Sequence, residues 1–122
     1  MNQIVLPGAM TLIANSALSR LRSYLDDHGD SLDAIFRQVR ADPEASISTR
    51  LRSLSGESAT EQERHDLVRS LRKLQDDLVA SIGEPVVEVA GAHMGADFDA
   101  GLRWHAARLT DITPILNLAY GA

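Results

Sequence analysis

The stretch "TEQERHDLVRSLRKLQDDLVASI", residues 60–82, sets the fold class because its apolar residues recur every three or four positions. That spacing places them on one stripe of an α-helix, with charged residues on the other faces. Thr60 and Glu63 have the spacing of a capping box, in which each side chain binds the other's backbone N–H. The segment therefore predicts a long amphipathic helix. Its stripe consists of Leu67, Leu71, Leu74, Leu78 and Ile82.

The same periodicity continues towards the N-terminus. Apolar residues spaced by three and four predict a first helix that begins near Gly8 and ends near Asp27, with Gly29 as its left-handed C-terminal cap. Asp30 or Ser31 then caps a second helix. That helix carries Leu32, Ile35, Phe36 and Val39 on its apolar stripe.

The segment "ADP", residues 41–43, predicts the end of the second helix and the start of a third, because proline is tolerated in a first helical turn. Asp42 is the expected cap of this third helix. Its apolar edge consists of Ile47, Leu51 and Leu54. The loop "SGESAT", residues 55–60, leads into the long helix.

Gly83 and Pro85 predict the end of the long helix. The following "VVEV", residues 86–89, is the only strand-like run, and it is viable only if "QIVL", residues 3–6, pairs with it. A last helix is expected over residues 96–111. Thr113 and Pro114 then cap a short C-terminal turn that reaches Tyr120.

These elements predict an all-α fold, a compact bundle of about five helices in a single domain over residues 1–122, with at most a minor two-stranded β element. The chain is 44% apolar but only 4% aromatic, so we expect a core of Leu, Ile, Val and Ala. Because the sequence has no cysteine, the fold cannot rely on disulfides or thiolate metal sites.

The charge and hydropathy of the sequence limit the kinds of partner that we expect. Twelve basic and seventeen acidic residues give a net charge of −5, so we expect no nucleic-acid partner. No apolar run is long enough to span a membrane, and no positively charged leader precedes the apolar N-terminus. We expect a cytoplasmic protein, with specialised non-cleaved export left open. Arginine supplies eleven of the twelve basic residues, which is typical of GC-rich coding and favours a bacterial source.

The densest stretch of chemically versatile side chains is "GAHMGADFDAGLRWHAARLTD", residues 91–111. On a helix His105 falls within the apolar stripe, so we interpret it as a neutral core histidine held by a hydrogen bond. Trp104 lies about 120° from that stripe, on a flank with Asp97, Arg108 and Asp111. There Arg108 can stack on the indole and pair with Asp111. We take these four residues as the candidate protein-binding site.

A metal site in this stretch would require His93, Asp97 and His105 to converge, and their spacing is not a recognised ligand pattern. We therefore expect no metal, no cofactor and no catalytic residues. The sequence also has no Gly-rich phosphate loop and no nucleophile elbow.

The segment "HDLVRSLRKL", residues 65–74, places His65 on the solvent side of the long helix beside basic residues. This part of the chain resembles the histidine phosphotransfer domains, which are also acidic helical bundles. The resemblance implies that His65 carries a phosphoryl group between signalling proteins. It stops at Val68 and Arg69, where that family has a lysine and a glycine. The matching positions are His65, Leu67, Ser70 and Leu74.

Arg22 and His28, in "RSYLDDH", have a spacing that resembles the Arg and His of the HEPN-type ribonuclease domains, which are helical as well. The resemblance implies an active site formed across a dimer, in an electropositive groove. Asp26, Asp27 and Asp30 crowd this pair, and a helix-end cap is the interpretation we favour.

The sequence favours a non-catalytic protein that binds another protein: an adaptor, a secretion-associated chaperone, an immunity protein or a phage-type inhibitor. The alternatives are a phosphotransfer module that uses His65 and a small helical nuclease or metal-dependent enzyme. The uncharged segments "IVLPGAMTLIA" and "ITPILNLAY", near the two ends, favour a homodimer slightly, because they leave an apolar surface to be covered.

Overall fold

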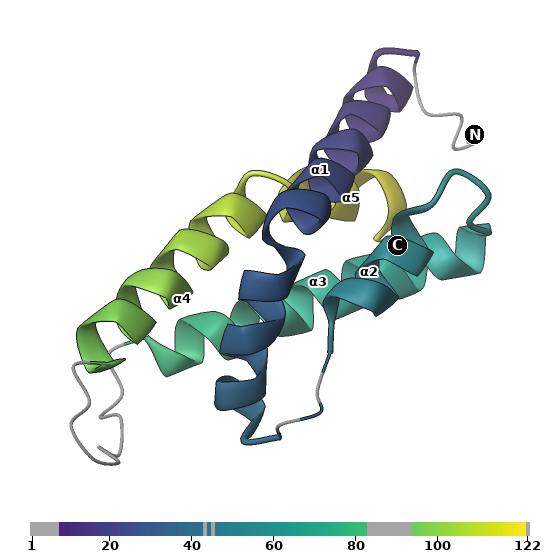
Figure 1. The fold of residues 1–122 in the computed structure, drawn as a ribbon. Helices are drawn as coiled ribbons and strands as arrows, with labels where there is room; N and C mark the ends of the chain where they lie inside the picture. Colours follow the sequence, from purple (N-terminus) through teal and green to yellow (C-terminus); the bar gives the residue numbers. More distant parts are fainter. Residues whose placement is uncertain (1–7, 43, 45, 83–93, 122) are drawn as a thin grey trace.

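The computed structural model describes residues 8–42, 44, 46–82 and 94–121. Within these ranges the chain is all-α and contains no strand, which confirms the predicted fold class. The helices are α1 (Gly8–Arg40), α2 (Ser48–Ser55), α3 (Glu61–Ser81), α4 (Met94–Thr110) and α5 (Thr113–Tyr120). The long helices α1 and α3 cross, and the shorter helices pack around them (Figure 1).

The core is built from the predicted stripes. The four leucines of α3 are buried, and α1 and α3 each pack against every other helix of the described chain. Leu102 and Leu109 of α4 and Leu116 of α5 are fully buried in the same cluster. The long amphipathic helix and its leucine stripe are therefore where the sequence predicts them.

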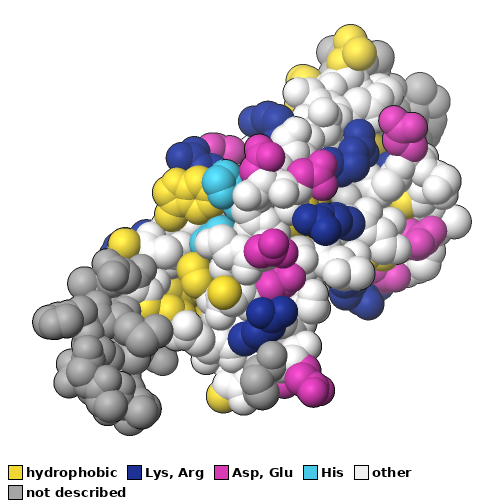
Figure 2. Space-filling view, in the orientation of Figure 1, with side chains coloured by type: hydrophobic (Ala, Val, Ile, Leu, Met, Phe, Trp, Pro, Cys, Tyr) yellow, Lys and Arg dark blue, Asp and Glu magenta, His cyan; other side chains and the backbone are white. Residues whose placement is uncertain are grey.

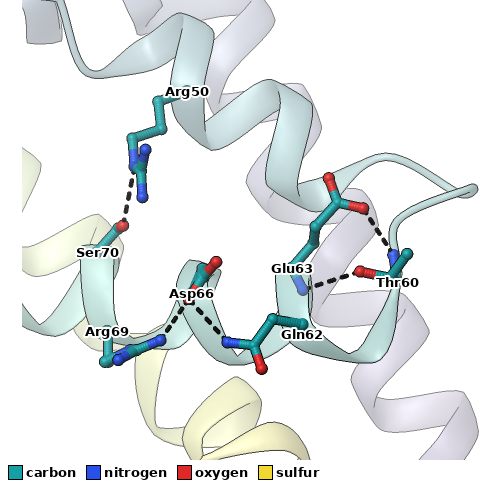
Figure 3. A network of polar contacts seen from close by, with 7 residues as sticks. All are labelled: Arg50, Thr60, Gln62, Glu63, Asp66, Arg69 and Ser70. Atoms are coloured by element: carbon teal, nitrogen blue, oxygen red, sulfur yellow. Dashed lines mark hydrogen bonds and ion pairs between the residues drawn. The ribbon is translucent and has the colours of Figure 1, made fainter.

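The α3 helix begins as predicted. The Thr60 hydroxyl accepts a hydrogen bond from the Glu63 amide at 3.1 Å, and the Glu63 carboxylate accepts one from the Thr60 amide at 2.9 Å (Figure 3). These two bonds form a capping box, which satisfies two backbone donors at the open end of the helix.

The predicted helix break at Gly29 is wrong, because α1 continues from Gly8 to Arg40 without interruption. Gly29 is buried beneath α2. A Cβ atom at this position would lie 2.9 Å from Arg52 Nη2 and 3.3 Å from Ser48 Cβ. The glycine therefore allows close approach of a neighbouring helix and does not cap α1. The Arg52 guanidinium fills this contact and donates to the Leu25 carbonyl at 2.6 Å.

The predicted stop at residues 41–43 is confirmed, since α1 ends at Arg40 and Ala41 adopts a left-handed φ of 52°. The start of the next helix is not where the sequence predicts it. Asp42 accepts from the Glu44 amide at 3.0 Å, and α2 begins only at Ser48. Asp42 therefore stabilises the turn and does not cap a helix.

The cap of α2 comes from a residue of α1 instead. Asp33 is only 6% exposed, and its Oδ1 accepts from the backbone amides of Ile47 at 2.9 Å and Ser48 at 3.0 Å. Its Oδ2 accepts from the hydroxyls of Ser48 at 2.5 Å and Ser46 at 3.3 Å. Burial acts to raise the pKa of Asp33, but these hydrogen bonds outweigh it, so that the pKa is lowered.

The other end of α2 is also held by side chains from its neighbours. Arg22 of α1 donates to the Ser55 carbonyl at 2.7 Å, and Arg64 of α3 donates to the Leu54 carbonyl at 2.9 Å. These are among the last carbonyls of the helix, which have no partner within it. An eight-residue helix is too short to be stable alone, so both of its ends depend on tertiary contacts.

The C-terminal turn is helix α5. Pro114 lies in its first turn as predicted, but the Thr113 side chain does not cap it. Thr113 is buried, and its hydroxyl has no hydrogen-bond partner among the residues that the structure describes. The predicted stop at Gly83 and Pro85 and the proposed pairing of residues 3–6 with 86–89 lie outside the described residues. Among the described helices, none is long and apolar enough to cross a membrane.

Replacing Asp33 with alanine should lower the free energy of unfolding by about 2–4 kcal/mol, because two amides and two hydroxyls then lose a charged acceptor in a buried site. Chemical denaturation followed by circular dichroism measures this loss. Because folding lowers the pKa of Asp33, its contribution is complete above the normal pKa of 3.8 and is lost as the pH falls below it.

Asp30→Asn is the matched control, since Asp30 is an exposed carboxylate on the same helix. It should change stability by no more than about 0.5 kcal/mol. Asp33→Asn should flatten the acid limb of the stability curve. An Asp33→Ala protein as stable as the control would contradict the assignment of Asp33 as the cap of α2.

Candidate functional site

Four aromatic side chains gather where α1 meets α4. Tyr24 and His28 come from α1, and Trp104 and His105 come from α4. We call them the α1–α4 aromatic cluster. The ring centroids of His28 and Trp104 are 4.6 Å apart, and those of Tyr24 and His105 are 5.7 Å apart. Figure 2 shows histidine side chains beside a hydrophobic patch in this region, with Lys or Arg side chains close by.

The two helices come close enough for this cluster because Gly101 has no side chain. A Cβ atom on Gly101 would lie 2.7 Å from Cδ1 of Ile35, which is tighter than real contacts allow. Ile35 follows Tyr24, His28 and Ser31 along one face of α1 at helical spacing. The glycine thus brings this face of α1 against α4.

His105 is the buried centre of the cluster. It is 2% exposed, and both of its ring nitrogens have partners on α1. Nδ1 lies 2.5 Å from the Tyr24 hydroxyl, and Nε2 lies 3.2 Å from the Ser31 hydroxyl. The structure therefore confirms a core histidine held by hydrogen bonds, as the sequence predicts.

Burial determines the protonation states of Tyr24 and His105. Burial raises the pKa of Tyr24, and the charge of Asp33 raises it further, so the hydroxyl keeps its proton and donates to Nδ1. Burial lowers the pKa of His105 to about 4, with His28 adding to the effect. His105 is then neutral at pH 7, with its proton on Nε2, which donates to Ser31.

Trp104 lies at the edge of the cluster and is 36% exposed. Its ring packs against those of His28 and His105, both in edge-on contact. The guanidinium carbon of Arg108 lies 5.0 Å from the ring centroid, so the predicted stacking of Arg108 on the indole is confirmed. The predicted pair between Arg108 and Asp111 is not formed, and Asp111 is exposed.

Of the four candidate residues, Trp104 and Arg108 are brought together. Asp97 is part of α4, but its side chain lies outside the described part of the structure. His28 was considered from the sequence only together with Arg22, and its place beside Trp104 was missed. Its i,i+4 spacing from Tyr24 is the signal that could have found it, but the supposed end of the helix near Asp27 concealed the shared face.

The other candidate residues lie elsewhere. His65 is 32% exposed on α3, and its Nε2 lies 4.0 Å from a Glu61 carboxylate oxygen. Arg69, one turn away, is ion-paired with Asp66 (Figure 3). A phosphoryl-carrying role for His65 stays a prediction.

Arg22 and His28 do not form one site. Arg22 binds the Ser55 carbonyl at the end of α2, whereas His28 contacts Trp104 of α4. Their spacing in the sequence is explained by two separate structural roles. No group of three or more metal-binding side chains occurs among the described residues. His93 lies outside those residues, and both ring nitrogens of His105 are already hydrogen-bonded.

Comparison with known proteins adds no identity to this geometry. No family model matches the chain, and neither a curated protein nor a solved structure matches it significantly. Function has therefore to be inferred from the arrangement of the described residues.

The burial of His105 predicts how the stability of the protein depends on pH. Because folding lowers the pKa of His105 from 6.5 to about 4, the unfolded chain binds more protons between these values. The contribution of His105 to stability should therefore be complete above pH 6.5 and fall as the pH drops towards 4. Nitrogen-15 spectra of the imidazole should show a neutral ring, protonated on Nε2, down to the lower value.

Tyr24→Phe should lower the free energy of unfolding by about 1–3 kcal/mol, because Nδ1 of a buried histidine loses its donor. Tyr120→Phe is the matched control, since no hydrogen bond of the Tyr120 hydroxyl is present among the described contacts. A cationic His105 at pH 6, or equal stability of the two variants, would contradict this arrangement.

Proposed function

We propose that the protein acts by binding another protein through a surface formed by His28, Trp104 and Arg108. The observation that supports this proposal most strongly is the position of Trp104, which is held on one side by two histidine rings and covered by a guanidinium, yet remains 36% exposed. The proposed role is that of an adaptor, a secretion-associated chaperone, an immunity protein or a phage-type inhibitor, none of which requires catalytic residues.

The physical argument for this proposal is that the Trp104 surface is already ordered before a partner binds. Trp and Arg are the residues most often found to dominate binding energy at protein interfaces. A ring already fixed by its neighbours loses little conformational freedom when a partner covers it, so more of the contact energy appears as affinity. The hydrogen bonds from Tyr24 and Ser31 to the buried His105 hold α1 and α4 together beside Trp104.

Charge suggests the nature of the partner. Asp27 and Asp30 are exposed on the same turn of α1 as His28, and Asp111 is exposed at the end of α4. The chain as a whole has a net charge of −5. A partner with an apolar pocket and a basic rim would complement this surface and would be attracted to it over a distance.

Replacing Trp104 and Arg108 together with alanine should weaken partner binding by about 2 kcal/mol or more, and it should cost less stability than truncation of a fully buried leucine of α4. The partner is first captured with the wild-type protein from its native host, and its affinity for each purified variant is then measured by calorimetry. Arg103→Ala is the matched control, because Arg103 is an exposed arginine of the same helix that pairs with Asp99. It should bind as the wild type does.

Leu102→Ala and Leu109→Ala provide the opposite comparison. Both leucines are fully buried, so each truncation should cost about 2–5 kcal/mol of stability. If the Trp104 and Arg108 double variant melts far lower yet still binds the partner, the proposed surface is wrong. The face of α3 with His65, Arg69 and Arg72 then becomes the next surface to test.

We further propose that the apolar ends of the chain favour a homodimer. Leu12 is 72% exposed and Ile13 is 47% exposed on α1, and Leu118 is 70% exposed on α5. A second copy would remove such side chains from water. Light scattering at micromolar concentration should give twice the chain mass of 13.3 kDa. A monomer mass would contradict the dimer and leave the Trp104 surface unaffected.

A further inference from the structure

A cavity of about 400 Å³ opens between the end of α1, the start of α2 and the middle of α3. Its volume falls in the range of cavities that hold small molecules. It shares no residue with the α1–α4 aromatic cluster. Its lining suits an amphiphilic ligand, because one part carries apolar side chains and another part carries cationic side chains.

The apolar part of the lining comes from all three of these elements. Leu74 of α3 is buried, and Phe36 of α1 and Ile47 at the start of α2 are partly buried. A planar or short aliphatic group placed here would leave water and contact side chains already packed on the core.

The cationic part is formed by Arg40, Arg50 and Lys73. Arg40 and Lys73 share a single carboxylate, since their nitrogens lie 3.9 Å and 3.6 Å from the same oxygen of Asp77. Both of these ion pairs are long, and an ion pair exposed to solvent contributes little to stability. One carboxylate therefore balances two cations.

Arg50 interacts with a carboxylate only outside the cavity lining, where its charge helps to lower the pKa of Asp66 after the larger effects of Arg69 and Gln62. The Arg50 Nε donates to the Ser70 hydroxyl at 3.4 Å across the gap between α2 and α3 (Figure 3), and Arg50 forms no ion pair with any described residue. The other carboxylate of the lining, Asp42, is held by the Glu44 amide. With three cations and two carboxylates the cavity carries a formal charge of +1, within a chain whose net charge is −5.

We propose that this cavity binds a small organic anion, a carboxylate or phosphate ester carried on an apolar body of about ring size. Arg50 and Lys73 bind the anionic group, and Phe36 and Ile47 contact the apolar body. Arginine suits this role because its planar fork of N–H donors matches a carboxylate or phosphate oxygen pair.

Phenyl phosphate is the probe that tests the proposal, because it combines the two features in one small molecule. Titration followed by amide chemical shifts should give saturable changes centred on Ile47, Arg50 and Ser70. Benzyl alcohol, which lacks the charge, and inorganic phosphate, which lacks the ring, should each bind at least about tenfold more weakly.

Two charge-removing variants and one control define the site. Arg50→Gln and Lys73→Gln should each raise the dissociation constant of phenyl phosphate about tenfold. Both side chains are exposed, so the fold should be unchanged. Arg20→Gln, an exposed arginine of α1 outside the cavity, should leave the constant within about twofold of the wild type.

Three results would overturn the proposal. One is a phenyl phosphate titration that does not saturate or whose shifts centre on other residues. Another is an unchanged dissociation constant in both glutamine variants. The third is inorganic phosphate that binds as tightly as phenyl phosphate, since the apolar lining then has no part in recognition.

Discussion

The buried carboxylate of Asp33 is the interaction on which the arrangement of the first three helices depends. It lies on α1, and its four hydrogen bonds reach the segment 46–48, where α2 begins. A charged group that is almost removed from water is costly unless it is fully hydrogen-bonded. The four donors offset that cost, and they do so only if α2 begins at this point against α1.

Fixing α2 has consequences along the whole of α1. The contact places Ser48 and Arg52 over Gly29, where a larger residue would force these side chains to move. The carbonyl of Leu25 receives the Arg52 guanidinium, and the end of α2 receives Arg22 and Arg64. The short helix is therefore held at both ends and along its length by side chains from α1 and α3.

The two surfaces proposed to have a function lie along α1. An uninterrupted α1 carries Tyr24, His28 and Ser31 on one face, where they meet α4, and it carries Phe36 and Arg40 at its end, where the cavity opens. Burial raises the pKa of Tyr24, and the charge of Asp33 raises it further, so the tyrosine hydroxyl stays protonated well above neutral pH. The same carboxylate thus fixes the start of α2 and influences the hydrogen-bonded chain beside Trp104.

The sequence alone determined the features that depend on local spacing. The leucine stripe and capping box of α3, the end of α1 near residue 41 and the buried position of His105 were all predicted from neighbours within a turn or two. Helical periodicity and capping geometry act over such short distances, so a single sequence is enough to recognise them. The stacking of Arg108 on Trp104 belongs to this group as well.

Only the tertiary structure decided what depends on residues far apart in the chain. Gly29 has the local character of a helix end, yet α1 passes through it, with Arg52 and Ser48 of α2 packed beside it. Asp33 caps a helix that starts fifteen residues later, and Tyr24 binds a histidine eighty-one residues away. Local preference is worth about 1 kcal/mol for a glycine, and a buried, charged hydrogen-bond network outweighs it. No local pattern encodes such long-range partners, because they are defined by packing and not by spacing.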